Sequence, residues 1–226
     1  MDLQEFKKEH IRTELGLDNT YGRILIIIDF GNVDYWFEED QQDADGNALA
    51  EDEKLTIDLD KIREFCSLFS ENARFYYGHD AERDSSLRFI IAAKHVFGGS
   101  RVFSKPMQKI RHHLKADEID ANKRILHEDG AGAYVYLHKC NFDVEITVDS
   151  IRLMKNYDTL MLFSSDADFV SLFRFLCKKG NDKKVILVKG GHITSSLREL
   201  SNKVISAQTI KRQITRIVKK KQKPGS

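Results

Sequence analysis

Three short, strongly apolar runs constrain the fold of this chain more than any other feature of its sequence. They read ILIII at residues 24–28, LMLF at 160–163 and VILV at 185–188. Continuous apolar runs of this length, often β-branched, are typical of strands that are buried on both faces of a parallel sheet. Because segments with helical spacing of apolar residues separate the runs, the sequence predicts one α/β domain with a mostly parallel sheet.

The same periodicity predicts the remaining elements. The first 17 residues repeat apolar positions at helical spacing, so we expect an amphipathic helix there. Asp58 is placed to begin a helix, and Ser196 and Glu199 have the spacing of a capping box. Further strands are expected at 73–78, 100–105 and 133–138, and helices at 57–69, 85–97, 142–157, 168–180 and 194–201.

Two segments fit more than one structure. Residues 106–132 are polar, and we expect helical pieces there and a loop through the sequence EDGAGA. Residues 142–157 carry apolar residues at alternate positions, as in a strand. However, Val144, Val148 and Ile151 also form one helical stripe, and the length of the segment favours a helix.

Charge is unevenly distributed along the chain, although the formal net charge is only +1. Residues 38–60 carry ten acids against a single base, whereas 105–115 and 211–223 are almost purely basic. We expect an acidic surface loop at 38–56 and a basic tail at 211–226. Basic blocks of this kind are either solvated surface or surfaces that contact phosphate, and both interpretations are kept.

Two basic or hydroxyl-rich segments are candidates for nucleic-acid contacts. In KGGHITSSL, glycines and hydroxyls precede a predicted helix, where backbone N–H groups favour phosphate. A tight turn followed by a cap at Ser196 is the simpler explanation of the same residues. With the basic tail included, the candidate contacts are Lys189, Ser195, Ser196, Lys211, Arg212 and Arg216.

Other function classes lack support in the sequence. The longest apolar run is too short to cross a bilayer, and the N-terminus mixes acids and bases where a signal peptide would be apolar. Three scattered cysteines form neither a disulfide framework nor a zinc motif. The glycine motifs of dinucleotide, Walker-type and hydrolase sites are absent. We therefore expect a soluble cytoplasmic protein with reduced thiols.

Carboxylates follow two of the predicted strands at the point where each strand ends. Asp29 and Asn32 come after the first strand, and Asp166 and Asp168 come after the strand at 158–164. If these strands are neighbours, their side chains converge on one cleft at the carboxyl edge of the sheet. Two further acids from the segment before the second strand would join them, Asp143 and Asp149.

Several carboxylates in one cleft repel one another unless a cation neutralises them. Ligands that are all oxygen favour Mg²⁺ or Mn²⁺ over zinc, and such a site suits phosphoryl chemistry, in which the metal activates water and stabilises charge on the phosphate. A single aspartate after a strand is more often a helix cap, and capping is the simpler explanation of Asp168 taken alone.

Three motifs, in this order and at these separations, resemble the NYN domain family of the LabA-like type, a branch of the PIN-like nucleases. They are ILIIIDFGN, KCNFDVEITVDSI and LFSSDADFVSLFRFLCKKG. The resemblance covers about residues 22–210 and leaves an N-terminal helical extension at 1–21. It implies a three-layer α/β/α, PIN-like fold with N- and C-terminal helical extensions, and metal-dependent cleavage of RNA.

The resemblance also implies which residues form the site. The residues expected both to bind the metal and to act in catalysis are Asp29, Asp143, Asp166 and Asp168. The residues expected to support them are Asn32, Asp149, Ser164 and Ser165. The family usually has glycine where this chain has Ser165 and Ala167, a change that keeps both carboxylates of the last motif.

The sequence therefore favours a ribonuclease in which a carboxylate-bound Mg²⁺ or Mn²⁺ activates water. Two alternatives are kept: a non-catalytic nucleic-acid-binding or regulatory protein on the same fold, and a structure-specific DNA nuclease. RNA is the expected partner, and no membrane partner is expected. A homodimer and a protein partner at the acidic loop are left open.

Overall fold

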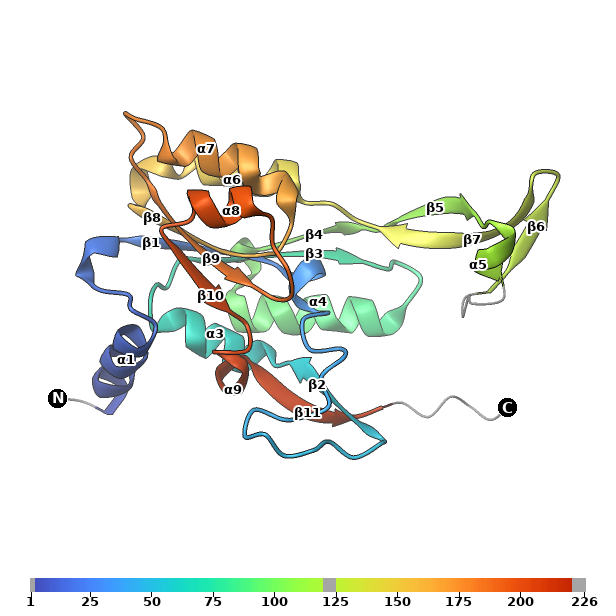
Figure 1. Ribbon diagram of the computed structural model, residues 1–226, viewed down its shortest axis with the longest axis horizontal. Coiled ribbons are helices and arrows are strands. Elements are labelled where there is room, and N and C mark those ends of the chain that lie inside the picture. The colour runs from blue at the N-terminus through green and yellow to red at the C-terminus, as the bar shows by residue number, and fades with distance from the viewer. Residues whose placement is uncertain (1–2, 120–124, 221–226) are drawn as a thin grey trace.

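Six parallel strands form the centre of the molecule (Figure 1). The structure, a computed structural model, describes residues 3–119 and 125–220. In spatial order the strands are β10 (Lys203–Ser206), β9 (Lys184–Lys189), β8 (Thr159–Phe163), β1 (Ile24–Asp29), β3 (Ala73–His79) and β4 (Val102–Pro106). The predicted parallel sheet is confirmed, and the first strand lies beside the strand that precedes Asp166 and Asp168, as expected.

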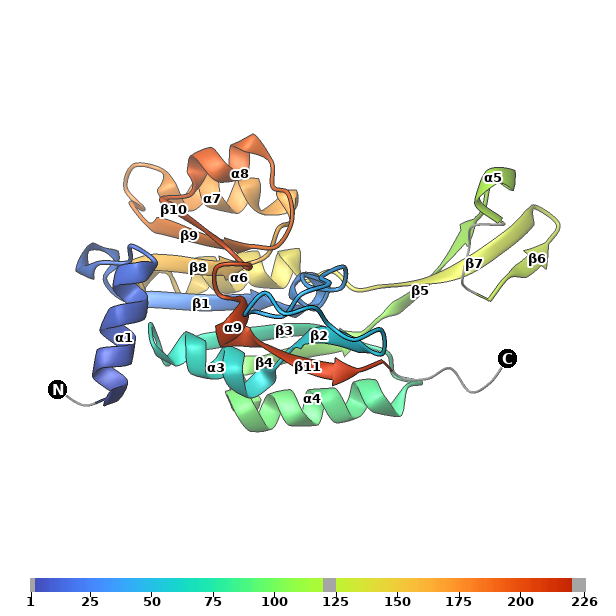
Figure 2. The same cartoon turned by 60° about the horizontal axis from the view of Figure 1, so that its bottom comes forward.

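Helices cover both faces of the sheet and make three layers (Figure 2). One face is covered by α3 (Leu59–Ser67) and α4 (Asp84–Phe97), and the other by α6 (Asp143–Arg152), α7 (Val170–Cys177) and α8 (Ser195–Leu200). Strand β1 divides its side chains between the two cores: Ile26 packs with the first set and Ile27 with the second. The predicted three-layer α/β/α architecture is confirmed.

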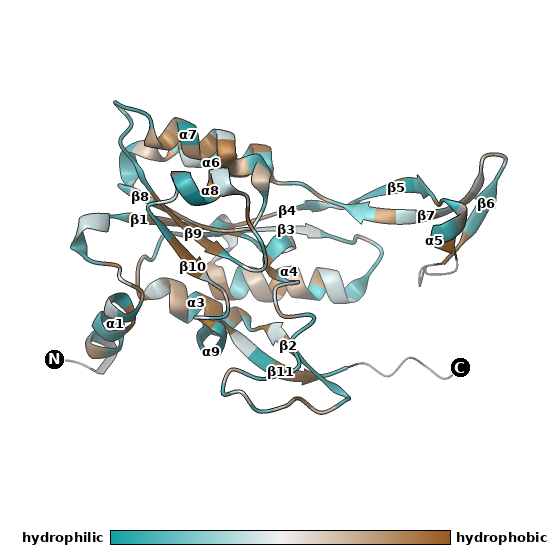
Figure 3. Ribbon diagram, in the orientation of Figure 1, coloured by the Kyte–Doolittle hydropathy of each residue, from teal (hydrophilic) through white to brown (hydrophobic). Residues whose placement is uncertain are grey.

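Hydropathy follows this layering (Figure 3). The central strands β1, β8 and β9 are the most hydrophobic part of the chain, and they are almost fully buried.

The N-terminal extension is helix α1 (Leu3–Glu14), whose Ile11 packs against the first core. Among the described residues, none of the helices combines the length and the apolar character that a membrane span requires.

Two predictions of local structure need correction. Helix α8 is capped by Thr194, whose side chain accepts a hydrogen bond from the Leu197 amide, so the proposed capping box at Ser196 and Glu199 is wrong. The segment at 142–157 does form a helix, but its apolar stripe faces outward, and Val144 is 72% exposed. The buried face of α6 is instead made by residues between the stripe positions: Ile146, Asp149 and Ser150.

The basic segment after residue 210 is folded onto the acidic loop. Helix α9 (Lys211–Ile214) leads into β11 (Thr215–Lys219), which pairs antiparallel with β2 (Glu53–Ile57). We name the acidic loop 38–56, together with the segment 206–220 that holds it, the clasp. The predicted loose tail is thus replaced by a helical turn and a strand over its described part, while residues 221–226 lie outside the description.

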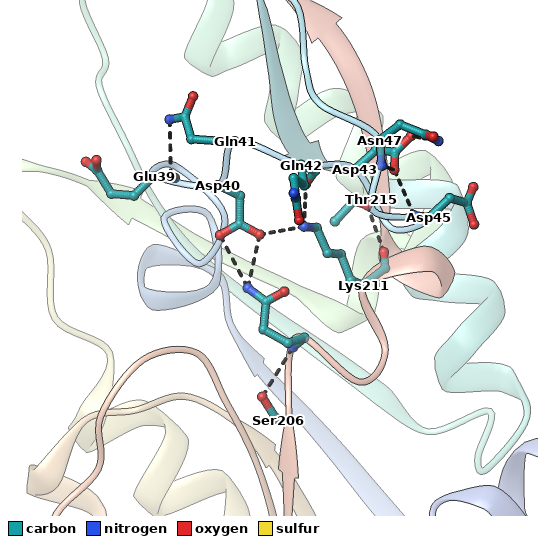
Figure 4. Close-up of polar contacts among 11 residues, drawn as sticks. Glu39, Asp40, Gln41, Gln42, Asp43, Asp45, Asn47, Ser206, Lys211 and Thr215 are labelled. Atoms are coloured by element: carbon teal, nitrogen blue, oxygen red, sulfur yellow. Dashed lines mark hydrogen bonds and ion pairs between the residues drawn. The ribbon is translucent and has the colours of Figure 1, made fainter.

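Complementary charge explains why this segment is held (Figure 4). The Lys211 Nζ lies 2.7 Å from an Asp40 carboxylate oxygen and donates to the Gln42 carbonyl, while the Gln208 amide donates to the same carboxylate. Arg212 pairs with Asp45. The opposite charges that the sequence shows in two distant blocks therefore meet in one structure.

The polar segment after β4 forms a projecting arm, in which the expected helical pieces are limited, among the described residues, to one turn and the expected loop to a tight turn at residues 130–131. Strands β5 (Gln108–His113), β6 (His127–Asp129) and β7 (Gly132–Lys139) form an antiparallel sheet in the order β5–β7–β6, which carries the single-turn helix α5 (Ala116–Ile119). We name residues 108–119 and 125–139 the β-arm. It extends away from the body beyond the carboxyl end of β4 (Figures 1 and 2).

Candidate functional site

Acidic side chains gather at the carboxyl ends of β1 and β8. Asp29 ends β1, and the pairing of Ile28 with Phe163 places Ser164 beside Asp29. After Ser164 the chain makes one 3-10 turn at Ala167–Phe169 before α7, and this turn carries the two acids of the last motif. Helix α6 packs against the same turn and begins with Asp143. The topology therefore brings three distant segments together, as the sequence predicts.

Ser164 and Asp166 fix the loop that holds the acids. The buried Ser164 Oγ donates to Asp29 Oδ2 at 3.1 Å and accepts from the Asp166 amide at 3.2 Å. One Asp166 oxygen, Oδ1, accepts from the Asp168 amide at 3.0 Å and so caps the 3-10 turn. The cap is therefore Asp166 and not Asp168, because Asp168 supplies only its amide. The Asp168 residue is exposed, so its carboxylate is accessible to solvent.

A second set of contacts orients the same loop from the opposite side. The Asn32 Oδ1 accepts from the Ser165 amide at 2.9 Å and from the Trp36 indole N–H at 3.1 Å. Ser165 Oγ donates to the Gly190 carbonyl at 2.5 Å. A Cβ on Gly190 would lie 2.3 Å from Trp36 Cδ1, so only glycine fits there. Trp36 and Gly190 are not among the site residues that the sequence predicts. The one sequence signal for Gly190 is the glycine pair in KGGHITSSL, which predicts either a phosphate contact or a tight turn.

Three carboxylates approach one another closely. Asp143, Asp166 and Asp168 each offer an oxygen, and these three oxygens lie within 4.8 Å of one another. We name these three residues the acidic triad. Within the part of the chain that the structure describes, no other group of three or more possible metal ligands is this compact.

Burial and like charge raise the pKa values of two of the acids. The pKa of Asp29 rises to about 6, mainly because the carboxylate is buried; the hydrogen bond from Ser164 opposes the rise, and the charges of Asp143 and Asp166 add to it. The pKa of Asp143 is also raised, by burial and then by Asp166 and Asp168, against a lowering contact with Asn141. A cation would relieve both effects, since it favours the charged form.

The acidic triad fits a magnesium or manganese ion better than a transition metal that prefers nitrogen or sulfur. Its donors are carboxylate oxygens alone. Oxygens that bind one Mg²⁺ ion each lie about 2.1 Å from the metal, so they lie roughly 3 to 4 Å from one another. The observed spacing of up to 4.8 Å needs only a small contraction. Side-chain rotation of the exposed Asp168 can supply it.

Asp149 does not join the other acids. Its carboxylate lies 2.6 Å from Arg74 Nη1, accepts from the Tyr76 hydroxyl at 2.6 Å, and has Arg152 Nη1 at 3.7 Å. The side chain is only 12% exposed, and Arg74 is 21% exposed. The structure therefore places Asp149 in a largely buried ion pair between α6 and β3, where it fixes the helix that carries Asp143.

The predicted nucleic-acid contacts are distributed unevenly. Lys189 donates to the Gly191 carbonyl, and Ser195 is exposed beside the cap of α8, while Ser196 is half-buried. Lys211 is buried in the clasp, so the structure removes it from the exposed cations that were expected to contact phosphate. Arg212 is also engaged by the acidic loop, and Arg216 lies 3.6 Å from an Asp58 oxygen.

The raised pKa of Asp29 gives a stability prediction for the metal-free protein. Since the folded-state pKa is about 6 and the ordinary value is 3.8, ionisation of Asp29 costs stability as pH rises through this window. We expect Asp29→Asn to stabilise the EDTA-treated protein at pH 7 by about 1 to 2 kcal/mol, below the limit of about 3 kcal/mol set by the pKa rise. Below about pH 4 the gain should vanish.

Urea unfolding at pH 4 and pH 7 measures this difference. Asp60→Asn is the matched control, because Asp60 is an exposed residue of α3, which covers the face of the sheet opposite α6 and α7. An Asp29→Asn protein that is less stable than wild type at pH 7, or equally stabilised at both pH values, would contradict the claim that burial and neighbouring charges raise the pKa of Asp29.

Comparisons with known proteins give a consistent result. The sequence model of the NYN domain matches residues 23–210. The low amplitude and bright protein LabA of Synechococcus elongatus is 30% identical over 76 residues, which are 34% of this chain and 40% of LabA. The crystal structure of VPA0982, a protein of unknown function from Vibrio parahaemolyticus, superposes with a TM-score of 0.56 at 19% identity, covering 88% of this chain and 99% of the other. This last likeness concerns the fold alone.

Proposed function

Because the chain belongs to the NYN domain family and has a PIN-like nuclease fold, we propose that it is a ribonuclease that depends on Mg²⁺ or Mn²⁺. The observation that carries the proposal is the approach of three carboxylates from two separate segments to within 4.8 Å. Crowded carboxylates destabilise the folded state because like charges repel, but the same arrangement favours the binding of a cation.

Each acid has a proposed part. The acidic triad would hold the cation, and Asp29, kept next to it by Ser164, would complete the charge of the site. A divalent cation bound there would polarise a water molecule and neutralise charge on the phosphate. Ser164, Ser165 and Asn32 would keep the loop in place, since their hydrogen bonds connect it to two neighbouring strands.

A direct cleavage assay tests this proposal. The full chain would be incubated with end-labelled RNA and with DNA of the same sequence, single-stranded and double-stranded, in Mn²⁺, Mg²⁺ or EDTA. We expect RNA to be cut with either metal and to stay intact in EDTA, because phosphate attack at this site needs the charge of the cation.

The other outcomes identify the alternatives. Cleavage of DNA but not RNA would make the protein a DNA nuclease with the same metal site. Binding of RNA without cleavage in either metal would favour a non-catalytic or regulatory protein. Cleavage that persists in EDTA would contradict the role of the acidic triad, and Asp166→Asn in the same assay would show whether the activity belongs to this protein.

A further inference from the structure

A cavity of about 900 Å³ lies between the β-arm and the body of the protein. From the β-arm it is lined by Lys109, His127, Tyr136 and His138. The body contributes the start of α4 with the loop before it, the end of β2, and residues just after β1. The cavity is large enough for two or three nucleotides, given that ligand sites for drug-sized molecules span roughly 300 to 1,000 Å³.

One face of the β-arm gathers aromatic and cationic side chains. Cross-strand partners in an antiparallel sheet lie on the same face. The register therefore puts three pairs on the face toward the cavity: Lys109 with His138, Arg111 with Tyr136, and His113 with Tyr134. The opposite face carries different residues, among them the exposed His112.

The rings on this face already stack with one another. The His127 ring lies parallel to Tyr134 with centroids 5.3 Å apart, and it meets Tyr136 edge-on at 5.2 Å. The Arg111 guanidinium lies 4.5 Å above the Tyr134 ring. His127, His113 and Arg111 are exposed and Tyr136 is half-buried, whereas Tyr134 is buried beneath His127 and Arg111. The one fixed cation among them, Arg111, also pairs with Asp129 at 2.7 Å. The flat surfaces that face solvent are therefore the His127 ring and part of the Tyr136 ring. Flat rings beside cations are the surface on which unpaired bases stack.

The cavity reaches the chain next to the acidic site, although the acidic triad itself does not line it. Phe30, which follows Asp29 directly, lines the cavity, and so does Met107 at the root of the β-arm. The β-arm leaves the body after β4 and returns to it through β7, four residues before Asp143. An RNA chain lying in the cavity would have to pass Asp29, the neighbour of Phe30, to reach the acidic triad.

We propose that this face of the β-arm and the cavity beneath it bind unpaired nucleotides of the RNA whose backbone reaches the acidic triad. The inference rests on the proposed function, since it names how the substrate is held. Two of the three acids that line the cavity lie beside cations: Lys109 pairs with Glu82, and Arg83 Nε lies 3.9 Å from Asp80, while Asp34 is the third. Stacking on the rings, more than net charge, would then provide the affinity, which selects single strands over duplexes.

Binding in EDTA tests the inference apart from cleavage. A fluorescein-labelled oligouridylate of about 12 nucleotides, within the usual site size of single-strand binders, would be titrated with the full chain and followed by anisotropy. We expect His127→Ala and Tyr136→Ala each to weaken binding about ten-fold, because one stacked base is lost. Tyr136→Phe should bind like wild type, since it keeps the ring.

The matched control is His112→Ala, which removes an exposed imidazole from the opposite face of the same strand pair. It should leave the affinity unchanged. Equal affinity of wild type, His127→Ala and Tyr136→Ala for the oligouridylate would overturn the inference. Equal binding of single-stranded and duplex RNA would also overturn it. A third contradicting result would be a dimer that Tyr136→Ala dissociates without a change in RNA affinity, because the cavity would then bind a second copy of this chain.

These results separate the two proposals. If the variants lose single-strand binding but wild type cuts no RNA with any metal, the β-arm inference stands and the nuclease proposal fails. If wild type cuts RNA with Mn²⁺ but His127→Ala and Tyr136→Ala bind and cut as wild type does, only the β-arm inference fails.

Discussion

Asp166→Asn should reduce metal-dependent RNA cleavage at least about 100-fold while leaving the protein folded. The substitution removes one of the three charges that approach within 4.8 Å, so the site would hold a divalent cation more weakly and neutralise less phosphate charge. The amide keeps the size of the side chain, and its oxygen can still accept from the Asp168 amide, as Asp166 Oδ1 does at 3.0 Å. The cap of the 3-10 turn should therefore survive.

Single-turnover cleavage of labelled RNA over a Mn²⁺ titration measures this loss. Thermal melts of the same samples provide the second readout. Added Mn²⁺ should raise the melting temperature of wild type and raise that of Asp166→Asn much less, because a ligand bound only by the folded state stabilises it by RT ln(1 + [L]/Kd), which falls as the affinity falls. Asp60→Asn controls for the loss of an acid elsewhere. A folded Asp166→Asn protein with native activity and a native Mn²⁺ shift would mean that Asp166 is only a cap.

Asp149→Asn should have the opposite phenotype. It leaves the Arg74 guanidinium without its anion in a largely buried position, and we expect a loss of about 2 to 3 kcal/mol. In a domain of this size such a loss lowers the melting temperature by about 5 to 10 °C. At a temperature where the variant is folded, RNA cleavage should be close to wild type, since Asp149 contacts Arg74 and Tyr76 and not the acidic triad.

A double-mutant cycle identifies the cause. If the ion pair with Arg74 carries the effect, the variant Arg74→Met with Asp149→Asn should be no less stable than either single variant, because neither charge is then left alone. Additive losses would show that the two side chains act independently. Loss of cleavage in a fully folded Asp149→Asn protein would favour the supporting role in the site that the family resemblance implies for Asp149.

The sequence predicts those elements of the fold in which buried apolar residues are continuous or recur at a regular spacing. Strand β1 is apolar on both sides because it lies between two helical layers, and that pattern is visible in ILIII without knowledge of its neighbours. Asp58 was identified from its place before a helix, and its side chain does accept from the Lys61 amide at 3.0 Å. The convergence of the carboxylates followed from one assumption, that β1 and β8 are neighbours, which the structure confirms.

Of the β-arm, the sequence predicts only the strand at 133–138, which the structure has as β7. Strand β5 is exposed along its whole length, so no alternation of apolar and polar residues marks it as a strand. The role of Asp149 was hidden for another reason: its partner Arg74 is 75 positions away, and no local pattern connects the two. Trp36 bonds to Asn32 four residues earlier, but its approach to Gly190 occurs only because two distant loops meet there, which sequence periodicity does not show.

The clasp has a consequence for how the chain reaches its native state. Strand β2 has β11 as its partner among the described strands, and about 160 residues separate their paired positions. During synthesis the acidic loop would emerge early and wait, unpaired, until the last described strand leaves the ribosome. Pairings so distant in sequence close late and slowly. A fragment trimmed to the family boundaries at 23–210 would keep every acid of the site yet lack β11 and Lys211, leaving an open strand edge and an unneutralised acidic loop that favour aggregation.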